Sequence, residues 1–146
     1  MSETTGNLTE KFAMGWLPDY PDFRDYTVSH KTILPAGIPS MFGFTVYSSI
    51  SQTGTTGKIP YPVSGEKIKG GHAIAAVGYD DNMKIKNTNP ASPETKGAFL
   101  IRNSWGTGWG SAGYGWFPYD YVLKGLAEDW WSLIKNEWID TGEFTL

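Results

Sequence analysis

A histidine and an asparagine in this sequence have the side-chain chemistry of a proton-transfer pair. His72 opens the apolar segment "HAIAAVGYD", and Asn103 ends the apolar segment "AFLIRN" thirty-one positions later. If the two segments are adjacent strands, the amide oxygen of Asn103 can accept the imidazole N–H and fix the tautomer of the ring. The other ring nitrogen is then free to act as a general base or acid. Taken singly, His72 is as well explained as a structural histidine and Asn103 as a turn residue.

The stretch after Asn103, "SWGTGWGSAGYGW", combines tryptophan with repeated glycine. A Trp105 ring lying over the His72–Asn103 hydrogen bond would exclude water from it, and the glycines would allow tight backbone turns beside a cleft. Together these residues would form the base and orienting part of a nucleophile–base–orienter triad.

The composition is that of an ordinary globular domain. The 146 residues, 40% of them hydrophobic, can bury a core in one domain. The net charge is −3 and lysine and arginine do not cluster, so we expect neither nucleic acid nor a membrane as a partner. Without cysteine, and with one usable histidine among scattered carboxylates, we expect no metal and no cofactor. No basic and apolar leader begins the sequence, which predicts a cytoplasmic location.

Short apolar segments must position these residues. Two connecting segments separate them, a Gly/Pro/Ser/Thr-rich loop at residues 51–71 and a polar excursion at residues 83–97. Pro118 is placed to open one helical turn. The tail "EDWWSLIKNEWI" fits helical spacing and strand composition equally well, so its periodicity does not decide between a helix and a strand. Three segments rich in β-branched and aromatic residues predict strands of a small antiparallel sheet or barrel: 41–50, 72–80 and 98–104.

With these elements in order, the sequence resembles the C-terminal half of the papain-like cysteine peptidases. The resemblance lies in "GGHAIAAVGYDD" followed by "GAFLIRNSWGTGWGSAGYGWFPYDYV". As in that family, His opens one strand, Asn-Ser-Trp-Gly ends a second, and Gly-Trp-Gly-x-x-Gly-Tyr follows. The polar excursion accounts for the long His-to-Asn spacing, since a loop can lengthen at little cost. "MFGFTVYSSI" and "GWLPDYPDFRDYT" also resemble bacterial and archaeal members, so the resemblance covers roughly residues 14–146.

The resemblance implies a mainly β fold, an antiparallel β-barrel like the right-half domain of the family, with one short helix after Pro118. It implies a single domain at residues 14–146, which follows a flexible tail at residues 1–13. It also favours a strand over a helix in the tail of the sequence. The strands implied are 22–27, 41–49, 72–80, 97–103, 113–117 and 129–137.

The same resemblance implies roles for four residues. His72 matches the catalytic histidine, and Asn103 matches the residue that orients it. Trp105 matches the indole that shields this pair and borders the cleft. Gly71, which precedes the histidine, is expected with Trp105 to contact substrate.

The helical half of the family, which carries the nucleophilic cysteine and the oxyanion glutamine, has no counterpart. Only eighteen positions separate Arg24, in the segment that should precede that half, from Phe42, in the segment that should follow it. The chain contains no cysteine, and Gln52, its one glutamine, lies in the wrong segment. Thr27 and Ser29 lie near the missing segment, but a hydroxyl would need an aligned oxyanion hole that the sequence does not supply. We expect an isolated chain of a hydrolase family that is proteolytically inactive.

Three hypotheses about function follow. The domain serves binding or assembly, as a homodimer formed through the face around His72 and Trp105, which the helical half covers in two-domain enzymes. Alternatively, a separate Cys-bearing helical chain docks on that face and the two complete a cysteine peptidase. The third hypothesis is a natural or engineered fragment whose motifs are idle. Peptide is a further candidate ligand of this face.

Overall fold

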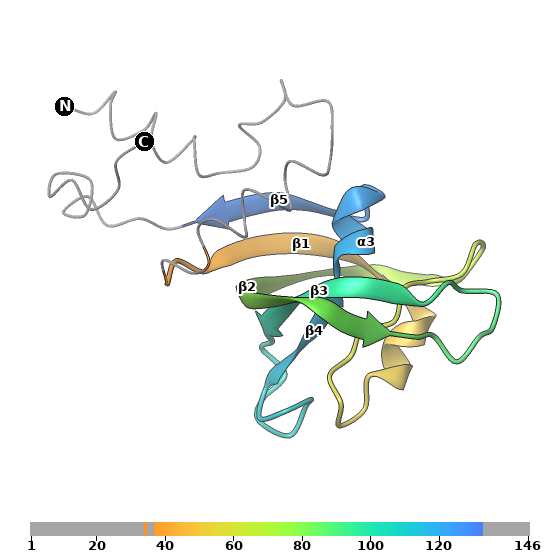
Figure 1. Cartoon of the computed structure of the whole chain (residues 1–146), viewed down its shortest axis with the longest axis horizontal. Helices are drawn as coiled ribbons and strands as arrows, with labels where there is room; N and C mark the ends of the chain where they lie inside the picture. Colours follow the sequence, from red (N-terminus) through yellow and green to blue (C-terminus); the bar gives the residue numbers. More distant parts are fainter. Residues whose placement is uncertain (1–33, 35–36, 133–146) are drawn as a thin grey trace, which may run out of the picture.

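The computed structural model describes residue 34 and residues 37–132 and has one antiparallel sheet as its framework (Figure 1). Two short helices accompany the sheet, the 3₁₀ helix η3 (Ser48–Gln52) and the α-helix α3 (Tyr119–Leu123). None of the described helices is long and apolar enough to cross a membrane. The mainly β class and the short helix after Pro118 are confirmed. The strands are β1 (Ser40–Tyr47), β2 (Ile68–Ile85), β3 (Thr95–Arg102), β4 (Tyr114–Pro118) and β5 (Ala127–Ser132).

The strand order is β4-β3-β2-β1-β5, and every neighbouring pair runs antiparallel. The last described strand therefore pairs with the first, on the side of β1 that β2 leaves free. Over residues 37–132 the sheet is open, with β4 and β5 as its edges. It has the antiparallel, barrel-like arrangement that the resemblance implies, without closing into a barrel.

The two faces of the sheet follow from the alternation along β1, "SMFGFTVY". Successive side chains of a strand point to opposite faces, and Phe42, Phe44 and Val46 are buried while Met41 is exposed. Phe42 stacks on Trp130 of β5, with ring centroids 3.9 Å apart and planes inclined by 11°. We call the side of Phe42 the inner face and the side of Met41 the outer face.

The boundaries of β2 were predicted too short. The strand spans Ile68–Ile85 rather than 72–80, so it takes residues from both connecting segments. Its far end is held by pairing, since Ile85 lies opposite Thr95 and is itself buried, after a register shift between Asp80 and Lys84. Pairing with β1 and β3 thus overrides the polar and glycine-rich composition at both ends.

The other predicted strands have mixed outcomes. The end of the predicted strand 41–49 is helical, because η3 begins at Ser48. The tail forms a strand in β5, Ala127–Ser132, as the resemblance implied. The predicted strand 22–27, residues 133–137 of the last strand, and the predicted boundary at residue 14 lie outside the described residues.

A single carboxylate ties η3 to the loop that precedes β2. Glu66 accepts hydrogen bonds from the Ser48 hydroxyl at 3.1 Å, from the Ser49 backbone N–H, and from the Val63 backbone N–H at 3.1 Å. Burial alone would raise the pKa of Glu66, but these hydrogen bonds favour the ionised form and hold its pKa below the ordinary value. The loop is therefore anchored by a charge-assisted cluster.

Candidate functional site around His72 and Asn103

The sheet brings the two predicted site residues together. His72 lies in β2 opposite Phe44 of β1, and Asn103 is the first residue after β3. Because β2 and β3 are antiparallel neighbours, the N-terminal part of β2 lies beside the C-terminal end of β3. His72 Nε2 and Asn103 Oδ1 are 2.9 Å apart, within hydrogen-bond distance.

Asn103 is held in place by hydrogen bonds that do not involve His72. It is 8% exposed, and its backbone N–H donates to the Gly113 carbonyl at 2.9 Å. Its Oδ1 also accepts the backbone N–H of Ser104 at 2.8 Å. An amide oxygen can only accept, so His72 must donate from Nε2, and the neutral imidazole then carries its lone pair on Nδ1. No described residue forms a hydrogen bond with Nδ1.

Aromatic rings hold the imidazole from two sides. The Trp105 ring stacks on His72, with centroids 4.8 Å apart and planes inclined by 19°. Phe44 meets His72 edge to face at 5.9 Å, and Trp109 in turn contacts Trp105 at 5.6 Å. Trp105 itself remains 45% exposed. The indole thus stacks on the imidazole that is bonded to Asn103 and is itself partly exposed to solvent.

The glycine-rich stretch after Trp105 packs backbone against backbone. The Trp116 N–H donates to the Gly57 carbonyl at 2.9 Å, and the Ile59 N–H donates to the Trp116 carbonyl at 2.9 Å. A β-carbon on Gly115 would lie 2.6 Å from the ring of Trp109 and would also collide with the Gly57 carbonyl. This close approach explains a glycine at position 115 without reference to chemistry.

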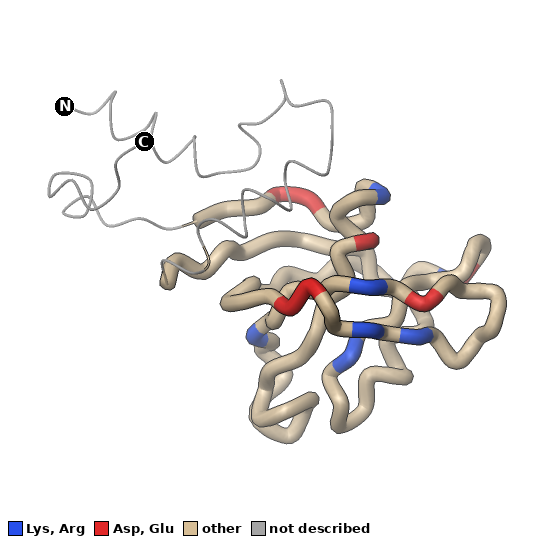
Figure 2. Tube along the Cα trace, viewed as in Figure 1, with Lys and Arg blue, Asp and Glu red and all other residues tan. Residues whose placement is uncertain are grey.

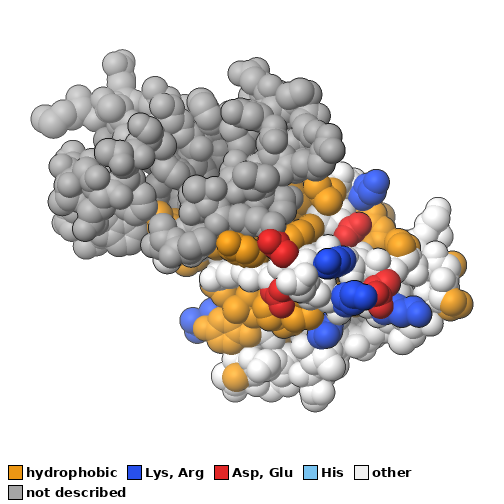
Figure 3. Space-filling model, viewed as in Figure 1, with side chains coloured by type: hydrophobic (Ala, Val, Ile, Leu, Met, Phe, Trp, Pro, Cys, Tyr) orange, Lys and Arg blue, Asp and Glu red, His pale blue; other side chains and the backbone are white. Residues whose placement is uncertain are grey.

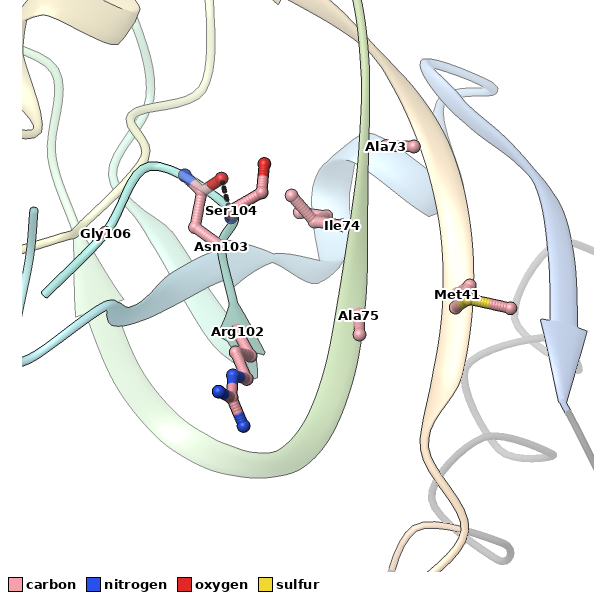
Figure 4. Close-up of a pocket in the computed structure, with 8 residues that line it drawn as sticks. All are labelled: Met41, Ala73, Ile74, Ala75, Arg102, Asn103, Ser104 and Gly106. Atoms are coloured by element: carbon pink, nitrogen blue, oxygen red, sulfur yellow. Dashed lines mark hydrogen bonds between the residues drawn. The ribbon is translucent and has the colours of Figure 1, made fainter.

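Two hollows flank the N-terminal half of β2. One, of about 430 Å³, is lined by Gly71 and His72 together with Glu128 and Asp129 of β5. The other, of about 530 Å³, lies on the far side of Ala73 and continues to Asn103, Ser104 and Gly106 (Figure 4). All four residues predicted for the site therefore lie at or beside these hollows, with Trp105 between Ser104 and Gly106 in the chain.

This arrangement can hold and exchange a proton but offers no attacking atom. The chain contains no cysteine, and no described hydroxyl is hydrogen-bonded to the imidazole Nδ1. Thr27 and Ser29 lie outside the described residues. Residues 37–132 also contain no group of three or more His, Asp and Glu side chains that could hold a metal ion.

The family model for papain family cysteine proteases matches residues 25–131, most of the chain. The chain belongs to the papain family. An uncharacterized peptidase C1-like protein of Acanthamoeba polyphaga mimivirus is 40% identical over 111 residues, which are 73% of this chain and 32% of that protein. The structure of xylellain, a cysteine protease from Xylella fastidiosa, superposes with a TM-score of 0.56 at 38% identity and covers 70% of this chain.

This papain-family chain spans about a third of both relatives, 32% of the mimivirus protein and 34% of xylellain. The match therefore covers only part of the length of these relatives. It does not carry the activity of either whole protein to this chain.

Sequence reasoning missed part of the surroundings of the pair. Arg102 and Met41 line the larger hollow, and Glu128 and Asp129 line the smaller one. The alternation in "SMFGFTVY" indicates that Met41 points away from the core. Its proximity to Arg102, two strands away, depends on pairing registers that no local pattern encodes.

Proposed function

We propose that this papain-family domain does not cleave peptides by itself and acts in binding and assembly through the surface around His72 and Trp105. The observation that carries the proposal is a hydrogen-bonded His72–Asn103 pair, with Trp105 stacked on the imidazole, in a chain without cysteine. Residues of a catalytic triad act as a unit, so a base without its nucleophile loses nearly all of the rate that the triad supplies.

The surface has features of a binding face. Five large hydrophobic side chains are exposed in the described residues, and Trp105 is one of them. Figure 3 shows a further patch of hydrophobic side chains, with acidic and basic side chains along its margin, on a face where no histidine is visible. Exposed aromatic side chains beside hollows are typical of protein and peptide contacts.

Peptide hydrolysis by the purified chain tests the inactive state. We expect the chain and its His72→Ala variant to give the same background rate on unstructured peptide substrates. Cleavage by the unmodified chain that is lost in His72→Ala would overturn the proposal, because it would require a nucleophile in the chain itself.

A second candidate is a subunit that completes a cysteine peptidase with a separate Cys-bearing helical chain. The specific observation in its favour is the state of His72, whose Nε2 is engaged by Asn103 while Nδ1 has no hydrogen bond to any described residue. This is the orientation that a general base needs if the thiol is supplied from outside.

Mixing tests this second candidate. Adding the isolated helical half of a papain-family protease should produce peptide hydrolysis if the two halves dock. The activity should disappear with His72→Ala in this chain or with Cys→Ser in the added half. Binding measured by calorimetry without any hydrolysis would favour the binding and assembly function instead.

A further inference from the structure

We propose that a second copy of this chain docks on the outer face of the sheet and forms a two-fold symmetric dimer. In this dimer, Met41 of each copy enters the hollow above Ala75 of the other, and Arg102 of each copy meets the acidic end of the other's β5. This interface lies on the outer face, whereas His72, which is opposite Phe44, lies on the inner face, so the inference goes beyond the proposed function.

One row of residues crosses the outer face through all five strands. Arg102 pairs with Tyr114 on one side and with Ala75 on the other, and Met41 pairs with Ala75 and with Trp131. Residues directly opposite each other on paired strands point to the same face. The row therefore reads Tyr114, Arg102, Ala75, Met41 and Trp131 from β4 to β5.

Large and small side chains stand next to each other at the centre of the row. Met41 is 54% exposed and Trp131 is 47% exposed, whereas Ala75 and its neighbour Ala73 form the floor of the 530 Å³ hollow. In Figure 4, Ala75 lies between Met41 on β1 and Arg102 on β3. A protruding methionine thus stands beside a depression large enough to hold a side chain of the same kind.

A two-fold axis that lies parallel to the strands, between β1 and β2, brings the protruding methionine of each copy opposite the hollow of the other. It places β1 of one copy over β2 of the other, and β3 over β5. Met41 then faces Ala75 of the second copy, and Arg102 faces Trp131 of the second copy. Each contact occurs twice, as an isologous interface requires, and two sheets packed face to face in this way are a common arrangement.

Charge complementarity favours a copy of the same chain over an unrelated partner. Figure 2 shows acidic residues on β5, and these are Glu128 and Asp129. Glu128 pairs with Gly43, two positions along β1 from Met41, a step of about 7 Å that an arginine side chain can span. Arg102, whose guanidinium lies 5.8 Å from the centroid of the Tyr114 ring, is two strands from Met41 on the other side. The centre of the face, with Arg102 on one side of Met41 and the acidic residues of β5 on the other, is complementary to itself after a two-fold rotation.

Sedimentation of charge variants tests the dimer. We expect the unmodified chain to sediment at twice the mass of one chain. Arg102→Glu and Glu128→Arg should each raise the dissociation constant at least about tenfold, because each brings like charges together twice. An equimolar mixture of the two variants should form heterodimers again, since each of the two contacts then joins opposite charges.

Lys96→Glu is the matched control, because Lys96 is an exposed base on the same strand as Arg102 but lies six positions away. It should leave the dissociation constant unchanged, and circular dichroism should show that all variants are folded. A monomeric unmodified chain at the highest soluble concentration, a dimer that neither variant weakens, or a mixture that stays monomeric would each overturn the proposal.

Peptide hydrolysis measured on the same samples separates this inference from the proposed function. A monomer without peptidase activity would overturn the second copy as partner and leave the inactive binding domain in place. A dimer that hydrolyses peptides through His72 would support the interface and overturn the proposed function.

Discussion

At the scale of single residues, Asn103 controls His72 through hydrogen-bond geometry without charge. Its amide oxygen accepts both the imidazole N–H and the Ser104 N–H. An acceptor at this position selects the imidazole tautomer that carries its proton on Nε2. The side chain of Asn103 is thus a positioning group for His72.

Replacing Asn103 with alanine removes this acceptor. We expect the imidazole of Asn103→Ala to populate both tautomers, as measured by the nitrogen chemical shifts of His72. We also expect a loss of about 1–3 kcal/mol in the free energy of unfolding, because the Ser104 N–H loses its partner. Asn103→Asp keeps an acceptor oxygen and should keep the Nε2–H tautomer. Unchanged nitrogen shifts in Asn103→Ala would show that another group selects the tautomer.

The pairing of His72 and Asn103 could be predicted from sequence because each stands at the end of an apolar strand segment. Trp105 could be placed with them because it follows Asn103 by two positions. The contribution of Ser104 could not be predicted, since it comes from a backbone N–H. Arg102 was missed because its environment depends on strands β2 and β1, which are remote in sequence.

At the scale of elements, the Glu66 cluster makes the join between η3 and the loop before β2 sensitive to pH. The pKa of Glu66 in the folded chain lies below its ordinary value of 4.5. The stability that the carboxylate contributes is therefore fully present above about pH 4.5 and is lost as the pH falls through the lower, folded-state pKa. This sign is the reverse of that for a group whose pKa is raised on folding.

Glu66→Gln should flatten this dependence. We expect the variant to be less stable than the unmodified chain at neutral pH, and the difference should shrink as the pH falls below 4.5, the ordinary pKa of the carboxyl. Urea unfolding midpoints across this range measure it. The pKa of Asp120 is raised by burial and works in the opposite sense, but it is common to both proteins. A constant difference at all pH values would contradict the assigned role of the carboxylate.

The start of β3 depends on a glycine packed against α3. Gly97 has a φ of +88°, and a β-carbon there would lie 2.5 Å from the Tyr119 ring, whose hydroxyl donates to Asp81 at 2.9 Å. Gly106→Ala is a control for backbone strain alone, since Gly106 has a φ of +81° and open space around it. We expect Gly106→Ala to cost about 1–2 kcal/mol.

Gly97→Ala should cost about 1–3 kcal/mol more than Gly106→Ala, because the collision with Tyr119 adds to the strain. Thermal or denaturant unfolding of the two variants measures the difference. Equal losses would mean that the Tyr119 ring moves away without cost.

The elements could be predicted where local composition and tertiary pairing agree, as in β1, β3 and α3. They could not be predicted where pairing overrides composition. The glycines and lysines at the start of β2 are typical of a loop, yet Ile68 pairs with Tyr47 and extends the strand. The last described strand, β5, needed the resemblance, since tryptophan and isoleucine suit a helix and a strand alike.

At the scale of the whole molecule, the sheet has one face that forms the core and one that does not. Phe42 and Met41 are adjacent in β1 but lie on opposite faces, with exposures of 2% and 54%. We expect Phe42→Ala to lower the free energy of unfolding by about 3–5 kcal/mol. Met41→Ala, measured on the monomer, should change it by no more than about 0.5 kcal/mol. A large loss with Met41→Ala would place the outer face in the core of the monomer.

The packing of Gly115 against Gly57 and Trp109 has a consequence for how chains of this kind are recognised. The glycine in "GYGW" is required by the way two loops of the β domain meet, and that requirement is independent of any reaction at His72. A chain that loses its nucleophile keeps the requirement for as long as it keeps the fold. The glycine and tryptophan spacing after Asn103 thus indicates common ancestry and a shared fold rather than catalysis. A genome search with this spacing will find active proteases and catalytically inactive domains together.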